Sequence, residues 1–600
     1  MATNRQVPGI LLFAGFCLCL LNIWLPSYFL TGDGPSHVYN AQVVHDLWSG
    51  KNVAFYTRFY DLVYQPNPNW LSTLAIAALM FLVNGVVAEK IFLTLYAAIY
   101  ICGFWQLLKK ISGGTSYLVL MILFFVFPQT LAKGFYNFSF SIGFYFWVVW
   151  SWLRFLDKKS IDKALLFFLF CGLCFFTHLL AFGFAAFTCQ ALVVSYAWAA
   201  SVESRAQKPI GYFVRFSLWL GLLLSPFLLL MGWFTKKEGG MQMHLKLHLY
   251  RLVELVQGKY LVNVTHPEDI IAQVVGMVML TLLCCSFFRV KKFYLHKYDG
   301  LLISLAFVLF VYLCFPESFL GRLILISMRT QIFVYILITC CVAYRFPKGE
   351  MKWRDAFILL IVFAVFGVAQ VIGLIIAQPG TLASTWSVNQ MIAINVSLQV
   401  IVLAIIFCCV AGKLPFDKIK NGAFALLFVC FIAFTGVRLS CLLKASEAIA
   451  DYTSAKSNIR PNSIVLPLDF APCGKDQEGR MIADRNFLFY HASQYMGLDK
   501  PLIILDNYEA NMGYFPLRWK DNVNPYFHLS KDEGIEAQPP YASINMYQQA
   551  GVTIDYVLMW CFDSSYLANE HFSELYAEIN AGYHIVYTSA TSRTKLYERN

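Results

Sequence analysis

Repeated apolar runs of about twenty residues constrain this chain more than any other feature, because each is long enough to cross a bilayer as a helix. Thirteen runs of this kind lie at 9–29, 87–107, 116–132, 139–156, 163–180, 181–200, 211–234, 270–288, 300–316, 330–345, 355–377, 391–411 and 421–440. Hydrophobic residues make up 58% of the 600 positions and charged residues 14%, and a soluble domain cannot bury that much apolar surface. The sequence therefore predicts a polytopic α-helical membrane protein with about thirteen transmembrane helices.

The positive charges lie in short clusters between the apolar runs rather than in one basic domain. These clusters are Lys109 and Lys110, 154–163, Arg205 and Lys208, 289–297, 345–354 and 413–420. Every second connection is basic, which is the excess that cytoplasmic loops carry. The pattern predicts a multi-pass protein of the cytoplasmic membrane, in contact with membrane lipids, with a cytoplasmic N-terminus and an outer C-terminus. The net charge of +11 then needs no nucleic-acid partner.

One further apolar stretch, at 70–84, is predicted not to cross the membrane. It is short for a span and follows the segment Q-P-N-P-N. If it crossed, the basic residues at 109–110 and 154–163 would face outward, against the charge rule. We therefore expect it to lie along the interface, within a first outer loop that covers 30–86.

Two domains are expected from the change in composition near residue 441. Residues 1–440 carry the apolar runs, whereas 441–600 are richer in Asp, Asn, Pro and Tyr. The second part is long enough for a core of its own. Segments at 463–468, 501–506, 554–560 and 583–588 read as strands and 565–580 reads as a helix. The C-terminal part is therefore predicted to be an extracytoplasmic α/β domain.

Asp33 is the principal candidate for chemistry because it directly follows the first apolar run. An ionisable group at a membrane face, where lipid-borne substrates arrive, is a functional hypothesis by default. The following residues, from Ser36 to Trp48, are amphipathic at helical spacing, and Pro35 suits a helix start, so a helix on the membrane surface is predicted. A charged carboxylate there can accept a proton from a hydroxyl group. The alternative is that Asp33 only caps this helix or forms a turn. His37 follows one helical turn later.

The segment D-G-P-S-H-V-Y-N-A-Q-V-V-H-D-L-W-S-G resembles the GT-C class of membrane glycosyltransferases, in the branch of protein O-mannosyltransferases and lipid A aminoarabinose transferases. The positions that match are Asp33, Tyr39, Ala41, Leu47 and Gly50. The Q-P-N-P-N-W-L segment resembles the start of the juxtamembrane helix of that class. Thirteen spans, a large first outer loop and an outer C-terminal domain are also similar. The resemblance to bacterial members implies a bacterial inner membrane.

Two positions depart from the pattern of the class. Gly34 stands where the branch has a second acid, and the second outer loop, K-G-F-Y-N-F, offers Asn137 where many members carry an acid. Divalent metals of the hard type need several oxygen ligands, and few carboxylates are present here. We therefore expect neither a catalytic metal nor another cofactor.

The resemblance implies a polyprenyl-phosphate sugar donor and a lipid, glycan or protein acceptor. Arginine suits a phosphate leaving group because its planar fork stays charged and binds two oxygens. Arg329 and Arg322, near the outer start of a predicted span, are the candidates for this task; the alternative is that both reach out to lipid headgroups. His178, Tyr39 and Asn137 are further candidates for substrate contact, although His178 is more ordinarily an interior hydrogen-bonded residue.

The predicted function is transfer of a sugar from the lipid-linked donor to an envelope acceptor, with Asp33 as the base. A transporter or lipid flippase is one alternative, but related halves with broken helices are not evident in the sequence. A non-catalytic envelope assembly factor is another, because the second acid is missing.

Overall fold

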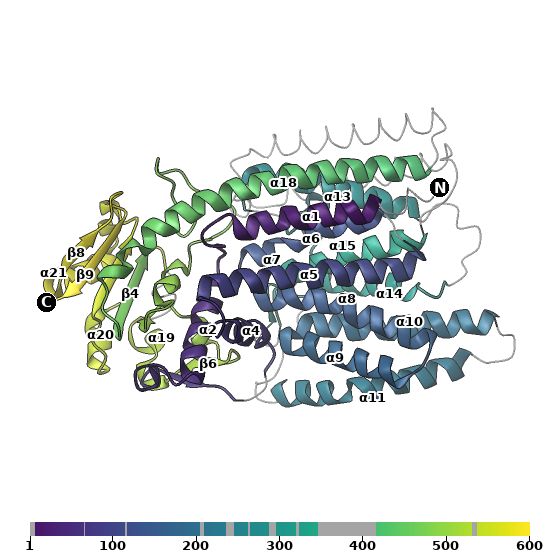
Figure 1. Cartoon of the computed structure of the whole chain (residues 1–600), viewed down its shortest axis with the longest axis horizontal. Coiled ribbons are helices and arrows are strands. Elements are labelled where there is room, and N and C mark those ends of the chain that lie inside the picture. The colour runs from purple at the N-terminus through teal and green to yellow at the C-terminus, as the bar shows by residue number, and fades with distance from the viewer. Residues whose placement is uncertain are drawn as a thin grey trace.

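The computed structural model describes residues 7–64, 67–114, 117–203, 209–235, 245–261, 264–286, 296–319, 323–345, 416–530, 534 and 537–600. Figure 1 shows a bundle of long helices, with a sheet-containing domain at one end of it. The short helices of the first loop lie between these two parts. The protein is thus a polytopic α-helical membrane protein with a C-terminal domain that contains a β-sheet.

The bundle is built from apolar helices that match most of the predicted spans. Their bounds are α1 (Val7–Trp24), α5 (Gly85–Ser112), α8 (Tyr136–Asp157), α9 (Ile161–Thr177), α10 (Leu179–Glu203), α11 (Pro209–Thr235), α13 (His266–Ser286), α14 (Gly300–Cys314), α15 (Ile326–Arg345) and α18 (Phe416–Thr453). Six of the described helices, namely α5, α10, α11, α13, α15 and α18, are long and apolar enough to cross a membrane. The predicted spans at 355–377 and 391–411 lie outside the described residues.

The apolar run at 116–132 is not one continuous helix. It consists of η2 (Tyr117–Met121), α6 (Ile122–Val126) and α7 (Gln129–Ala132). Phe127 leaves the helical region, and Pro128, which lacks a backbone N–H, directly precedes α7. The break lets the chain turn before Lys133 and Gly134, which lie against Asp33. The prediction of a single span here was therefore wrong in detail.

The first loop contains α2 (Gly34–Trp48), α3 (Val53–Tyr56), β1 (Tyr60–Leu62) and α4 (Leu71–Leu79). With nine residues, α4 is about 14 Å long, too short to cross a bilayer, as predicted. The prediction that α2 lies on the membrane surface was wrong. Its residues from Gly34 to Asp46 are all buried, because its polar side chains contact the C-terminal domain rather than water.

A five-stranded sheet forms the core of the C-terminal domain, in the order β5, β4, β7, β9, β8. The strands are β4 (Ser463–Asp469), β5 (Leu502–Ile504), β7 (Tyr556–Trp560), β8 (Tyr583–Thr588) and β9 (Thr594–Arg599). The first three are parallel and fully or largely buried, while β9 pairs antiparallel with β7 and β8. The helix α21 (Glu570–Gly582) leads into β8. The predicted strands and helix are thus present, and β9 was missed.

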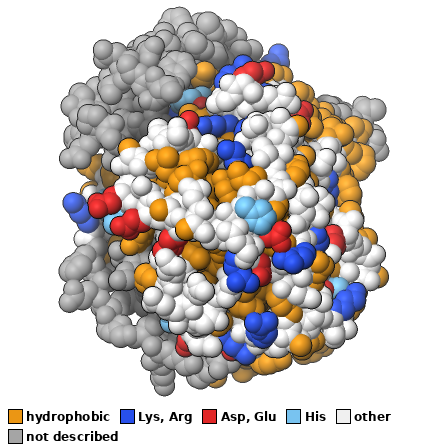
Figure 2. All heavy atoms as spheres, turned by 90° about the vertical axis from the view of Figure 1, so that its left-hand side faces the viewer, with side chains coloured by type: hydrophobic (Ala, Val, Ile, Leu, Met, Phe, Trp, Pro, Cys, Tyr) orange, Lys and Arg blue, Asp and Glu red, His pale blue; other side chains and the backbone are white. Residues whose placement is uncertain are grey.

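Several contacts hold the C-terminal domain against the membrane domain. The strand β1 of the first loop pairs antiparallel with β6 (Leu517–Trp519) of the C-terminal domain. The 38-residue α18 continues from the bundle to that domain, as Figure 1 shows. The guanidinium of Arg485 pairs with Asp269 at the start of α13. At this end of the molecule acidic and basic side chains alternate with apolar patches, which suits a surface that faces water (Figure 2).

Candidate functional site

Asp33 precedes α2 at the N-cap position, but its side chain does not cap the helix. The Oγ1 atom of Thr31 does so instead, because it accepts a hydrogen bond from the N–H of Gly34 at 3.1 Å. The backbone N–H of Asp33 donates to the carbonyl of Lys133 at 2.9 Å. The carboxylate is therefore available for other contacts, which argues against the capping alternative.

The chain around Asp33 is packed too tightly for larger residues. A Cβ atom on Gly134 would lie 2.3 Å from the backbone nitrogen of Asp33, and φ at this glycine is +89°. A Cβ atom on Gly34 would lie 2.4 Å from the Tyr136 hydroxyl. A side chain at position 34 would therefore require Thr31 or Tyr136 to move, and the packing around Asp33 is built on the glycine.

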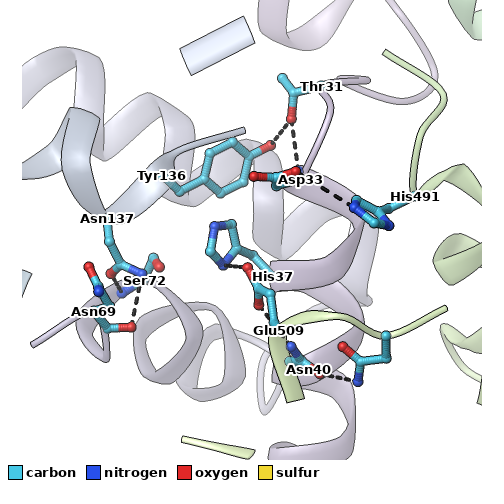
Figure 3. Close-up of polar contacts among 12 residues, drawn as sticks. Thr31, Asp33, His37, Asn40, Asn69, Ser72, Tyr136, Asn137, His491 and Glu509 are labelled. Atoms are coloured by element: carbon cyan, nitrogen blue, oxygen red, sulfur yellow. Dashed lines mark hydrogen bonds and ion pairs between the residues drawn. The ribbon is translucent and has the colours of Figure 1, made fainter. Parts of the chain in front are cut away.

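The Asp33 carboxylate points toward residues of the C-terminal domain (Figure 3). Tyr508 donates a hydrogen bond to it, and Nε2 of His491 lies 3.8 Å from its Oδ1. Burial is the largest cause that raises the pKa of Asp33 to about 7; the carboxylate of Glu509 adds to it, while Tyr508, His37 and Lys133 oppose it. The Asp33 side chain is 18% exposed.

His491 is a neutral neighbour of that carboxylate. Its ring is 1% exposed and stacks on Tyr508 at 4.6 Å between centroids. Burial, with a smaller contribution from the charge of His37, lowers the pKa of His491 to about 3. The ring therefore shields Asp33 from water without bringing a compensating positive charge.

His37 and Glu509 form a buried ion pair between α2 and the C-terminal domain. The Nδ1 atom of His37 lies 2.8 Å from Oε1 of Glu509, and Nδ2 of Asn40 donates to the other carboxylate oxygen at 2.8 Å. Burial alone lowers the pKa of His37, but Glu509 and Asp33 outweigh this effect and raise it above its ordinary value. The prediction that His37 shares the surroundings of Asp33 agrees with this geometry.

A second buried carboxylate, Glu89, supports the same site from α5. It accepts hydrogen bonds from the Tyr136 hydroxyl at 2.6 Å and the Tyr495 hydroxyl at 2.9 Å. The Tyr136 ring stacks on His37 at 5.2 Å. Glu89 thus joins the membrane domain, the first loop and the C-terminal domain behind Asp33.

Arg329 lies at the start of α15 on the other side of the site. Its guanidinium packs over Phe135 at 4.7 Å and Phe138 at 5.6 Å, and Asp33 is among the groups whose charge acts on it. The residue is 8% exposed, and within the described part of the chain its buried Nε atom has no hydrogen-bond partner. An arginine in this state presents unused donors to a ligand.

Lys133 is a second cation near the carboxylate. Burial lowers the pKa of its ammonium, and the charge of Asp33 opposes that shift. Together with Arg329 it provides positive charge around Asp33 that an anionic ligand can use.

His178 lies between α9 and α10, beside the arginine. Its ring meets Phe138 edge-on at 5.1 Å, and its Nδ1 accepts the backbone N–H of Leu180 at 3.2 Å. In the neutral ring the proton is therefore on Nε2, which is a donor. His178 therefore lies near Arg329 and Phe138. Its contact with substrate stays a prediction.

Tyr39 and Asn137 are engaged elsewhere in the fold. The Tyr39 hydroxyl donates to the carbonyl of Leu502 at 2.8 Å and the residue is fully buried, so it joins α2 to β5. The amide of Asn137 accepts from the N–H of Ser72 at 3.0 Å and donates to the carbonyl of Asn69 at 2.9 Å, which fixes the start of α4 on α8 (Figure 3). Arg322 lies outside the described residues.

The sequence analysis missed the residues that the C-terminal domain contributes. Tyr508 and Glu509 follow β5 in a segment rich in Asp and Asn, and His491 ends the run R-N-F-L-F-Y-H. No local pattern indicates that these segments meet residues 33–40. Among the described residues no group of three or more His, Cys, Asp or Glu is arranged to hold a metal ion.

Comparisons with known proteins give a fold likeness alone. No family model matches the sequence, and no curated protein matches it. Among solved structures, the "Crystal Structure of ArnT from Cupriavidus metallidurans bound to Undecaprenyl phosphate" is similar at 12% identity and a TM-score of 0.45, over 97% of this chain and 97% of that one.

Proposed function

We propose that this chain is a membrane glycosyltransferase that moves a sugar from a polyprenyl-phosphate-linked donor to an acceptor hydroxyl. The observation that carries the proposal is the meeting of two groups at the junction of the membrane and C-terminal domains. One is the partly exposed carboxylate of Asp33, which does not cap α2, and the other is the buried Arg329, whose Nε has no hydrogen-bond partner among the described residues. The charge of Asp33 acts on Arg329. A base and a phosphate-binding cation are what such a transfer requires.

In the proposed reaction the acceptor oxygen attacks the anomeric carbon while its proton passes to the carboxylate of Asp33. The bond between that carbon and the phosphate oxygen breaks, and the electron pair leaves with the phosphate. Arg329 and Lys133 stabilise the negative charge that develops there. A single in-line displacement of this kind inverts the anomeric centre. A pKa of about 7 for Asp33 suits a base that must release its proton again near neutral pH.

The same proposal includes the two domains and the membrane topology that the sequence predicts. Residues 1–440 hold the lipid-linked donor, and 441–600 close the site from the water side. The N-terminus is cytoplasmic and the C-terminal domain extracytoplasmic. The alternating basic loops support this orientation, which would deliver the donor from the outer leaflet to Asp33.

The deciding experiment compares envelope lipids and glycans by mass spectrometry in the native host. A strain that lacks the chain is complemented with wild type, Asp33→Asn or Arg329→Ala, and the matched controls are Asp61→Asn and Arg58→Ala. Asp61, with a 63% exposed side chain, and Arg58 belong to the same loop but lie at its surface. A sugar-sized mass that wild type and both controls restore, and that neither site variant restores, is the expected result.

Full restoration by Asp33→Asn would overturn the proposed base and favour the assembly-factor or transporter alternatives. Binding of polyprenyl phosphate to the purified protein gives an independent readout. Loss of the arginine should weaken it by about 100-fold, which corresponds to the removal of one charge-assisted contact. Asp33→Asn should leave that binding intact, because the carboxylate serves the acceptor.

A further inference from the structure

An open groove runs along the exposed face of α11, away from the candidate site. It has a volume of about 530 Å³, and its apolar lining includes Ile210, Val214, Leu218 and Leu222, together with Trp219 and a single charged residue, Arg215. Residues 215, 218, 219 and 222 lie on one stripe of the helix because of their spacing. Leu218 is 69% exposed and Leu222 is 62% exposed. The groove therefore offers an apolar track with one basic residue, Arg215, in the half nearer the start of α11.

A second cation adjoins the groove near Arg215. The Lys159 ammonium lies 4.3 Å from the ring centroid of Phe216, which keeps it next to α11. Partial burial is the main cause that lowers the pKa of Lys159, and the charge of Arg215 adds to it, so the two cations are close together. Both residues are exposed. Within the described part of the chain no ion pair or hydrogen bond of either side chain is formed.

This end of the bundle is remote from Asp33. The helix α8 begins at Tyr136, whose ring stacks on His37, and ends at Asp157, two residues before Lys159. Its 22 residues span about 33 Å, roughly the thickness of a bilayer core. The two cations thus lie at the membrane face opposite the candidate site, at the depth of lipid headgroups.

We propose that the groove on α11 binds one phospholipid with an anionic headgroup. Arg215 and Lys159 contact the headgroup, and the acyl chains follow Leu218 and Leu222 along the helix. Two neighbouring cations repel each other, and a net negative headgroup removes that repulsion, whereas a zwitterionic headgroup does so only in part. The apolar track matches acyl chains because the face is exposed where the helix passes through lipid. This inference is independent of the proposed transferase activity.

Native mass spectrometry of the full-length protein, titrated with phosphatidylglycerol or with phosphatidylcholine, tests the proposal. We expect one phosphatidylglycerol to be retained in preference to phosphatidylcholine. Arg215→Ala and Lys159→Ala should each weaken it by about fivefold, the factor that one basic residue near an anionic surface contributes. The control Lys109→Ala, an exposed lysine at the same end of the bundle, should bind like wild type.

A second measurement locates the lipid. Phosphatidylglycerol with brominated acyl chains should quench part of the tryptophan fluorescence of the wild type. This quenching should be reduced in Trp219→Phe, because Trp219 is the residue next to the bound lipid. Equal retention of the two lipids, an equal loss in Lys109→Ala, or quenching that is unaffected by Trp219→Phe would each overturn the proposal. These outcomes would indicate a nonspecific lipid shell around α11.

Discussion

The Nδ1 atom of His37 and the Oε1 atom of Glu509 lie 2.8 Å apart, and both residues are nearly or fully buried. One belongs to the first loop and the other to the C-terminal domain. This pair therefore makes the geometry around Asp33 depend on how two distant parts of the chain dock. Asn40 and Asn507 extend the contact, since the Nδ2 atom of Asn507 donates to Oδ1 of Asn40 at 2.7 Å.

Removal of both partners should destabilise the protein by less than the sum of the two single removals. We expect His37→Gln or Glu509→Gln to cost about 3 kcal/mol each, because each leaves a buried polar group without its partner. The double variant should cost less than the sum of the two. Denaturant titration of the purified protein measures this coupling, and simple additivity would contradict a direct interaction.

The same pair should weaken in alkaline solution. The folded protein raises the pKa of His37. The stability that this group contributes is therefore fully present below the pKa of His37 in the unfolded state, and it is lost as the pH rises through the pKa in the folded state. The coupling measured at pH 6 should therefore exceed that at pH 9. Equal coupling at both values would indicate a neutral hydrogen bond.

Asp33 should reduce stability at alkaline pH. Its pKa in the folded protein is about 7, above the ordinary value of 3.8. Between these two pH values the folded state binds more protons than the unfolded state, so stability falls as the pH rises through this range. Asp33→Asn removes this loss, and we expect the melting temperature at pH 8 to rise by about 2 °C. At pH 4 the two proteins should melt alike. A variant less stable than wild type at pH 8 would contradict the burial of the charge.

His491 should set the pH at which the proposed transferase becomes active. His491→Ala admits water to Asp33, and the weaker burial lowers the pKa of that carboxyl. The acidic limb of the rate profile should move about one pH unit lower, because a more hydrated carboxyl loses its proton earlier. His528→Ala, which removes a partly exposed histidine of the same domain, serves as the control and should leave the limb in place.

Asn137→Ala should loosen the start of α4. The change removes the hydrogen bonds to Ser72 and Asn69, each of which contributes about 1 kcal/mol. Hydrogen exchange of the amides at 71–74 should become faster. Asn137→Asp keeps the acceptor for the Ser72 N–H and should give an intermediate rate. Unchanged exchange in Asn137→Ala would assign the residue to substrate rather than to the fold.

The sequence predicted the elements whose signals are local. Apolar runs and basic loops identified the membrane helices and showed that 70–84 does not cross. Alternation and turn residues identified β4, β5, β7 and β8 of the C-terminal domain. Pro128 is evident in the sequence, but the apolar pattern does not predict that Phe127 leaves the helical region. The break in the run at 116–132 was missed for this reason.

The sequence indicated only some residues of the candidate site, whose role stays a prediction. Asp33 and His37 stood out because of their position after the first span, and Arg329 because of its charge at the start of another. Glu509, His491 and Tyr508 approach Asp33 only through docking of the C-terminal domain, and one sequence carries no signal for such long-range contacts. The interpretation of α2 as a surface helix failed for the same reason, since its polar face is covered by that domain.

The order in which the chain is made has a consequence for this arrangement. Asp33 emerges from the ribosome with the first membrane helix, whereas Glu509 follows the last described helix of the bundle, α18, and belongs to a domain whose sheet is completed only by β9 at 594–599. During synthesis the carboxylate is therefore solvated and ordinary in its acidity. The burial that raises its pKa arises only when the C-terminal domain folds back onto the beginning of the chain, so an incomplete protein in the membrane lacks the proposed base in its shifted form.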